Sequence, residues 1–409
     1  MINSITKHTV KYYKTIFEIL PQTFKFIEEL KTITSTDLKK ENELKKYKQE
    51  FQKRVTEMFE TTPYVLRTEI HDEFFTQDGI KFLIRLFKED IFAGKEYSID
   101  QKQNQNISKQ EKIKDDLSLN TTDVDQTTNN KKSNFDPFAP PFKENFVIEE
   151  NFNNLHTHRI FFSKYPVMNE HLLIVTRDFS SQYTHLTYDD IKNAVSLMYV
   201  MDGVLFFNAG KKAGASQIRK HMQCIHLDKL YKKDFGLFLL VSDDKNLTLL
   251  DSNFPNSVLM NININKHEEE SIFKIYSINQ FRDSNINHVF IKFSSDFSQN
   301  FRENLSNQNL DIYCRIFHRL YNLCLVDRSL IDQDNEESVT KDYSFLLTDE
   351  WMLVVPRKTH EVFFNQGKLN INSIGYLLMF MCNNKELVKE IKVTNIMKEV
   401  FSELTEDFN

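Results

Sequence analysis

The chain has 409 residues and a formal net charge of −6 at pH 7, so it can hold two domains or one large domain with an ample core. The acidic balance argues against a dedicated nucleic-acid binder, and no apolar run approaches the roughly 20 residues that span a bilayer. Four scattered cysteines without a C-x-x-C pair favour free thiols in a reducing compartment.

The first 60 residues are predicted to form an N-terminal helical extension, because their apolar residues follow a helical spacing that Pro21 interrupts. Such helices offer surface for protein partners. Residues 1–17 contain three lysines and no acid. We interpret this as an ordinary basic helix in a cytoplasmic protein, with a mitochondrial presequence as the alternative.

The next elements are separated by a polar insertion. Asp78-Gly79 predicts a turn, and the apolar run Ile80–Leu86 predicts a strand after it. Residues 98–134 are rich in Asn, Gln, Lys, Asp, Ser and Thr with almost no apolar content, so we expect a disordered insertion. Prolines within Asp136–Phe142 predict an extended segment where the fold resumes.

Residues 61–97 and 135–330 are predicted to form one α+β domain, followed by a C-terminal section over residues 331–409. In the domain the predicted elements are strands His158–Phe162 and His171–Thr176, helix Tyr188–Met201, and strands Val204–Phe207 and His221–Leu227. In the C-terminal section we expect paired strands at Phe345–Leu347 and Trp351–Val355, and a helix starting in Ile374–Met381.

The segment between the last two strands of the domain is the most informative part of the chain. Gly210 and Gly214 lie among alanines in a chain with only 8 glycines, and small residues let main-chain N–H groups converge on a phosphate. Ser216 and Gln217 add side-chain donors. His221 follows on the next strand, and a neutral imidazole can attack phosphorus as a nucleophile.

Alternation along that strand places two further side chains on the face of His221. Gln223 could bond a phosphate oxygen or the leaving group, and Arg219 could neutralise developing phosphate charge. A metal site is a weaker interpretation, because His156 and His158 lack an evident third ligand. The chain contains no G-x-S-x-G motif, so the sequence does not support a serine hydrolase.

Several motifs resemble, in consistent order, the diadenosine tetraphosphate phosphorylases (ATP adenylyltransferases) of the histidine-triad superfamily. At the centre these are Asn208-Ala209-Gly210, Ala213-Gly214-Ala215-Ser216-Gln217 and Lys220-His221-Met222-Gln223. Further matches are Asn134–Pro141, Phe161–Val167 with His171–Thr176, Leu346–Met352 with Val355-Pro356-Arg357, and Asn372–Tyr376 with Met379.

The resemblance implies an α+β fold of histidine-triad type, in which an antiparallel sheet with flanking helices holds a nucleotide. It implies phosphorolysis of a dinucleoside tetraphosphate to ADP and ATP through an adenylylated histidine, here His221, with Gln223 and Arg219 at the other catalytic positions. The positions that it assigns to nucleotide binding are Ser163, Lys164, Asn208, Gly214, Ala215, Ser216, Gln217, Asn372, Ser373, Ile374 and Met379, with Lys95 as a weaker candidate. The expected ligands are the dinucleotide, ATP, ADP and phosphate. No cofactor is required, although a divalent cation could accompany the nucleotide.

The sequence departs from the family pattern at several of these positions. The first motif histidine is Arg219, two loop prolines are replaced by Lys211 and Ile218, an expected lysine is Asn383, and Ser163 stands where asparagine is usual. A backbone carbonyl near the first histidine orients the nucleophile in this family, and arginine also supplies a carbonyl. Two hypotheses therefore stay open: an active nucleotidyltransferase, and a catalytically weakened relative that acts as a nucleotide-binding or structural subunit of a larger assembly.

Overall fold

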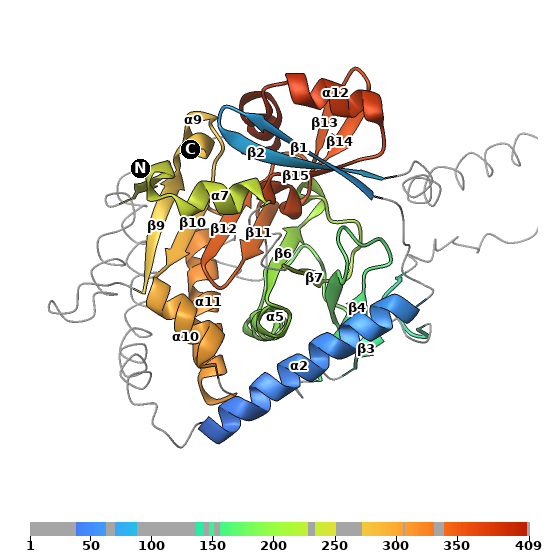
Figure 1. Cartoon of the computed structure of the whole chain (residues 1–409), viewed down its shortest axis with the longest axis vertical. Coiled ribbons are helices and arrows are strands. Elements are labelled where there is room, and N and C mark those ends of the chain that lie inside the picture. The colour runs from blue at the N-terminus through green and yellow to red at the C-terminus, as the bar shows by residue number, and fades with distance from the viewer. Residues whose placement is uncertain are drawn as a thin grey trace, which may run out of the picture.

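The computed structural model describes residues 38–62, 70–87, 136–142, 147–150, 156–227, 234–250, 272–305, 307–330 and 339–406. The predicted insertion at 98–134, Lys95 and the helices expected before residue 38 lie outside the described residues. Figure 1 shows a large sheet with helices on both sides. The mixed α+β architecture with a mainly antiparallel sheet confirms the predicted fold class.

A ten-stranded sheet forms the centre of the molecule. Its strands in spatial order are β3 (Val147–Glu149), β4 (His158–Phe162), β5 (Leu172–Thr176), β7 (His221–His226), β6 (Gly203–Ala209), β11 (Tyr343–Leu347), β12 (Trp351–Pro356), β10 (Val289–Phe293), β9 (Phe273–Ile278) and β8 (Leu247–Leu249). All the neighbouring strands are antiparallel. The C-terminal strands β11 and β12 therefore lie between β6 and β10, so the two parts of the chain share one sheet.

A smaller sheet joins the beginning and the end of the chain. It contains β1 (Ile70–Gln77), β2 (Ile80–Phe87) and β15 (Met379–Cys382), and β15 pairs with β2 in parallel. The helix expected to start in Ile374–Met381 is wrong. A 3-10 turn, η5 (Ser373–Leu377), ends at Leu378 with a φ of 63°, and the apolar run after it extends beside β2. A separate hairpin consists of β13 (Glu361–Phe364) and β14 (Gly367–Asn370).

Helices cover both faces of the large sheet because side chains alternate along each strand. In β6, Leu205 and Phe207 pack on one face, and Val204 and Phe206 pack on the other. The first face is covered by α2 (Leu38–Thr61), α5 (Tyr188–Met201), α10 (Ser295–Glu303) and α11 (Asn307–Asp327). The apolar core on the second face also includes the smaller sheet and takes residues from η5, α7 (Gly236–Ser242), α9 (Asn279–Asp283), α12 (Lys385–Val393), the π-helix η6 (Ile396–Phe401) and α13 (Ser402–Leu404).

Helix α5 has the bounds that its apolar spacing predicts, and its start is fixed by a capping box. Thr187 accepts the N–H of Asp190, while the Asp190 carboxylate accepts the N–H of Thr187. This reciprocal pair satisfies two N–H groups that the helix leaves without intrahelical partners. Asp190 is buried, and its carboxylate also accepts a hydrogen bond from the Lys220 ammonium.

The paired strands expected near the C-terminus are confirmed as β11 and β12, and the turn at Asp78-Gly79 is confirmed by positive φ angles of 51° and 77°. All four cysteines are free thiols, as expected from their spacing, and all four are buried. None of the helices in the described part of the chain combines the length and apolar character that crossing a bilayer requires.

Candidate nucleotide site

The site lies where strands β6 and β7 diverge. Their antiparallel ladder runs from Gly203–His226 to Phe206–Gln223 and ends there, although β6 continues to Ala209 and β7 begins at His221. We call this divergence the fork. Residues 210–220 connect its two arms. A sheet whose strands separate exposes main-chain groups that other parts of the chain, or a ligand, can bind.

The loop that closes the fork turns tightly at two glycines. Gly210 and Gly214 have φ angles of 87° and 90°, which strongly favour glycine. A Cβ on Gly210 would lie 2.4 Å from the Asp342 carboxyl group, and one on Gly214 would lie 2.8 Å from the Asn372 Cβ. Hydrogen bonds within the loop, from Gly214 N to Lys211 O at 2.9 Å and from Ala215 N to Gly210 O at 3.1 Å, hold the turn.

His221 begins β7 and is buried, with its ring against Phe138 at a centroid distance of 5.4 Å. Its Nδ1 lies 2.9 Å from the carbonyl oxygen of Arg219. Because a carbonyl only accepts, Nδ1 carries the hydrogen, and the neutral ring keeps the lone pair on Nε2. Burial lowers the pKa of His221, with the bond to Arg219 opposing part of that effect, so the neutral form predominates at pH 7.

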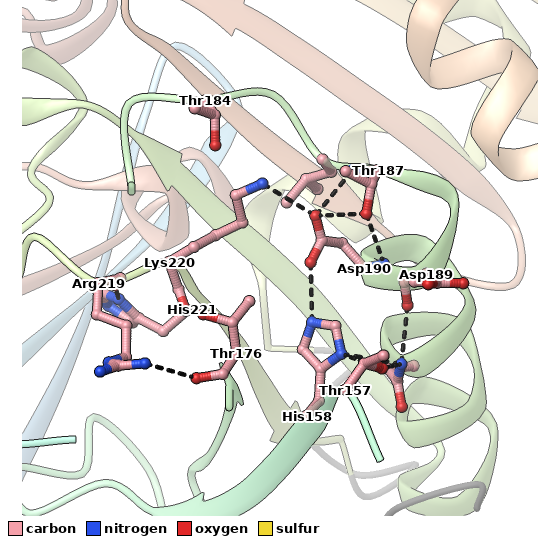
Figure 2. A network of polar contacts seen from close by, with 12 residues as sticks. Thr157, His158, Thr176, Thr184, Thr187, Asp189, Asp190, Arg219, Lys220 and His221 are labelled. Carbon is pink, nitrogen blue, oxygen red and sulfur yellow. Dashed lines mark hydrogen bonds and ion pairs between the residues drawn. The ribbon is translucent and has the colours of Figure 1, made fainter. Parts of the chain in front are cut away.

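The Arg219 carbonyl makes the contact with His221 that was expected of a main-chain carbonyl at this position. The side chain of Arg219 is directed elsewhere, as Figure 2 shows. The guanidinium bonds Asp136 at 2.7 Å and the carbonyls of Thr176 and Arg177 at 3.1 and 2.9 Å. The partly buried Asp136 carboxylate and two carbonyls therefore engage Nε and Nη1 of Arg219. That Arg219 offers its charge to a phosphate stays a prediction.

The structure brings Asn208, on the β6 arm of the fork, together with the C-terminal motif. The Ser373 N–H donates to Asn208 Oδ1 at 2.8 Å, and the Ser373 hydroxyl donates to the Phe207 carbonyl at 2.7 Å. Asn372 caps η5 by accepting the N–H of Ile374 and lies against Gly214. Residues 165 positions apart in sequence are therefore in direct contact here.

Arg357, from the Val-Pro-Arg motif, keeps this C-terminal segment in place. Its buried guanidinium donates to the Ser344 hydroxyl at 2.8 Å and to the Ile371 carbonyl at 2.7 Å. Ser344 pairs with Asn208 in the β6–β11 ladder. The arginine thus ties the chain just before Asn372 to the strand beside β6.

The other predicted site residues divide into accessible and buried groups. Lys164 and Ser216 are exposed, and Gly214, Ala215, Gln217 and Gln223 are half-buried around the loop and β7. Ser163 is buried and its N–H donates to the His171 carbonyl at 2.9 Å. Ile374 and Met379 are 0 % and 1 % exposed within the apolar core, so these two side chains pack against the protein rather than towards the loop.

A buried polar network lies on the opposite face of β7 from His221, and sequence reasoning missed it. The Lys220 ammonium bonds the Asp190 carboxylate at 3.0 Å and the His185 carbonyl at 2.8 Å (Figure 2). His158 Nε2 lies 2.8 Å from the other Asp190 oxygen, so its ring is engaged within the protein. Burial alone would raise the pKa of Asp190, but the His158 hydrogen bond and the Lys220 charge outweigh it and hold the pKa well below its usual range.

Gln182 is another residue near His221 that the sequence analysis did not identify. Its fully buried amide contacts main-chain atoms of both arms of the fork. For Lys220, a signal existed in the alternation of the strand, because a lysine next to a buried histidine must face the other side. For Gln182, no such signal existed, since it comes from an irregular segment before α5.

Residues 38–236 match a family model described as the Ap4A phosphorylase N-terminal domain, and residues 285–405 match one described as the ATP adenylyltransferase C-terminal domain. The chain belongs to this family of enzymes, which confirms the resemblance inferred from its motifs. The first match includes α2.

Two relatives from Saccharomyces cerevisiae are similar over much of their length. Diadenosine 5',5'''-P1,P4-tetraphosphate phosphorylase 2 is 25% identical over 284 residues, which cover 65% of this chain and 74% of the relative. Protein APA1 is 26% identical over 269 residues, which cover 63% and 71%. Among solved structures, yeast Ap4A phosphorylase Apa2 superimposes with a TM-score of 0.56 at 18% identity, covering 87% of this chain and 94% of that one. Its complex with Ap4A gives a TM-score of 0.55 at 18% identity, with coverages of 88% and 98%.

Proposed function

We propose that the chain cleaves diadenosine tetraphosphate with phosphate, and that His221 Nε2 is the nucleophile. The observation that supports this most directly is the hydrogen bond from His221 Nδ1 to the Arg219 carbonyl, which leaves the lone pair on Nε2. The lowered pKa of His221 keeps that lone pair available near neutral pH. Imidazole then splits one difficult phosphoryl transfer into two easier steps.

In the first proposed step, Nε2 attacks the α-phosphorus of one adenosine. An N–P bond forms, the bond from phosphorus to the bridging oxygen breaks, and ATP leaves with that oxygen. In the second step, an oxygen of inorganic phosphate attacks the same phosphorus, and the N–P bond breaks. The adenylyl group and phosphate together give ADP, and the lone pair returns to Nε2.

Other residues have roles that follow from their positions around the fork. We assign the main-chain N–H groups and side chains of Gly214, Ala215, Ser216 and Gln217 to the phosphate chain, because this loop closes the fork next to His221. Gln223 is half-buried one alternation beyond His221 and can reach the reacting phosphate or the leaving oxygen. We assign Asn208 on the β6 arm, together with Asn372 and Ser373 at the start of η5, to orienting the nucleotide.

A mass measurement tests the proposal. The protein is mixed with diadenosine tetraphosphate without phosphate, and we expect one added AMP that maps to His221. Adding phosphate should remove the adduct and release ADP, and His221→Ala should give neither product. His226→Ala is a matched control, because His226 lies at the other end of the same strand. Absence of both adduct and ADP from the wild-type protein would refute the activity and favour a weakened relative that only binds nucleotide.

A further inference from the structure

The side chain of Gln182 joins the two arms of the fork. Its Oε1 accepts the His221 main-chain N–H at 2.7 Å, and its Nε2 donates to the Asn208 carbonyl at 2.8 Å and the His221 carbonyl at 3.2 Å. The side chain is 0 % exposed. Both amide hydrogens and one acceptor position are therefore used by main-chain groups of the protein.

These contacts lie where the ladder between β6 and β7 stops. Continuing the register of Phe206–Gln223 by two residues would place Asn208 opposite His221. In an unbroken antiparallel ladder the main-chain groups of two such residues would bond each other. The Gln182 amide takes their place, so the strands stay apart while their main-chain groups remain satisfied.

We propose that Gln182 is a positioning residue for adenylylation, which rests on the function proposed above. It fixes the main chain of His221 on one arm and of Asn208 on the other, and so sets the separation between nucleophile and nucleotide. The Arg219 carbonyl orients the His221 ring by accepting a hydrogen bond from it. The Ser373 N–H orients the Asn208 side chain by donating to it. Gln182 couples these two orientations without touching substrate, because its amide is buried behind them.

The size of the effect follows from the geometry of attack. Removing the amide leaves a buried N–H and two buried carbonyls without their partner, and the arms must shift to regain bonds. A misplacement of about 1 Å between reacting groups costs roughly 10²-fold in rate. We therefore expect the adenylylation step to slow by about 10-fold to 100-fold, with nucleotide affinity within about 3-fold of wild type.

The test uses Gln182→Met, which keeps the length of the side chain and removes its polar atoms. The matched control is Gln77→Met. Gln77 also bridges main-chain groups, donating to the Thr394 carbonyl at 2.7 Å and accepting the Ile396 N–H at 2.8 Å, at the end of β1. Rapid-quench measurements with diadenosine tetraphosphate give the rate constant and the apparent affinity of AMP transfer to the protein. Thermal unfolding of both variants shows whether they lose similar stability.

We expect slow transfer with near-normal affinity only in Gln182→Met. Wild-type transfer rates in that variant, or equal slowing in Gln77→Met, would overturn the positioning role. If Gln182→Met does not fold, Gln182→Glu replaces it. Glutamate keeps an oxygen that accepts the His221 N–H, but its second oxygen faces the carbonyls of Asn208 and His221 and is repelled by them. We expect the same selective slowing of AMP transfer. An unchanged rate in this variant would also overturn the positioning role.

Hydrogen–deuterium exchange separates this inference from the activity itself. The His221 N–H should exchange at least 10-fold faster in Gln182→Met, because its acceptor is gone, while amides of β9 keep their wild-type rates. If the wild-type protein forms no AMP adduct, the proposed function fails, and exchange alone then decides whether Gln182 fixes His221. Unchanged exchange of His221 would overturn the inference whatever the activity.

Discussion

Replacing Lys220 by methionine tests the energetics of the buried polar network beside His221. The side chains of Lys220 and Asp190 are 2 % and 3 % exposed, and their charged atoms lie 3.0 Å apart. Methionine fills nearly the same volume, so the variant removes charge without creating a large cavity. Breaking a buried pair by removing one partner costs about 3–5 kcal/mol, because the other charge stays buried. We expect a loss of unfolding free energy of that size.

The dependence on pH provides a second check of the same variant. The pKa of Asp190 is depressed in the folded protein, so its stabilising contribution is present above the unfolded value of 3.8 and is lost as pH falls through the folded value. Without Lys220 the pKa of Asp190 must rise, and protonation relieves the uncompensated charge. The difference in stability between wild type and Lys220→Met should therefore narrow as pH falls below 3.8.

Urea unfolding followed by fluorescence of Trp351 measures these differences, since Trp351 is the single tryptophan and is 1 % exposed. A double-mutant cycle with Asp190→Asn isolates the pair, with an expected coupling above about 1 kcal/mol. Lys389→Met is the control, because its pair with Glu386 is 71 % and 58 % exposed and should cost less than about 0.5 kcal/mol. A stability loss in Lys220→Met as small as that in Lys389→Met, or a coupling between Lys220 and Asp190 near zero, would refute the reasoning.

Three further predictions concern the loop and two histidines. Gly210→Ala should destabilise the protein by at least about 1 kcal/mol and weaken nucleotide binding in calorimetry, because φ is 87° and the new Cβ meets Asp342; unchanged affinity and stability would contradict it. Because the pKa of His221 is lowered, the acid limb of the adenylylation rate should lie below pH 6.5, and a midpoint at or above that value would argue against the neutral nucleophile. Burial lowers the pKa of His288 to about 4, so protonation should cost about 3 kcal/mol of stability between pH 6.5 and 4. His288→Gln should lose that part of the pH dependence in denaturant titrations, and an unaltered slope would count against it.

The elements that the sequence predicted well are those in which local signals and packing agree. Tyr188–Met201 combines helical spacing with a capping threonine at position 187, and the structure has the same bounds. The segment after Ser373 was predicted wrongly because a short apolar run fits either a buried helix or a buried strand. Residues 379–382 form a strand because they pair with the free edge of β2, and no signal within these four residues indicates that this edge is available.

The sequence proposes a set of candidate site residues but not their geometry. The loop glycines and His221 stand out by their type and order, and their roles stay predictions. The direction of the Arg219 side chain depends on Asp136, which lies 83 positions earlier in sequence. Gln182 lies 39 positions before His221, in a segment without periodicity, so only the folded chain shows that its amide reaches the fork. Long-range contacts of this kind leave no local pattern.

The interleaved strand order has a consequence for dividing the protein. A fragment that ends before residue 285, where the second family match begins, would lose β10, β11 and β12 and leave the edge of β6 with unpaired main-chain groups next to the loop of residues 210–220. It would also lose β15, which covers one edge of β2. Exposed strands of this apolar character pair readily with other chains. The two family segments are therefore halves of one folding unit, and they can be expected to complement each other when produced together while each alone aggregates.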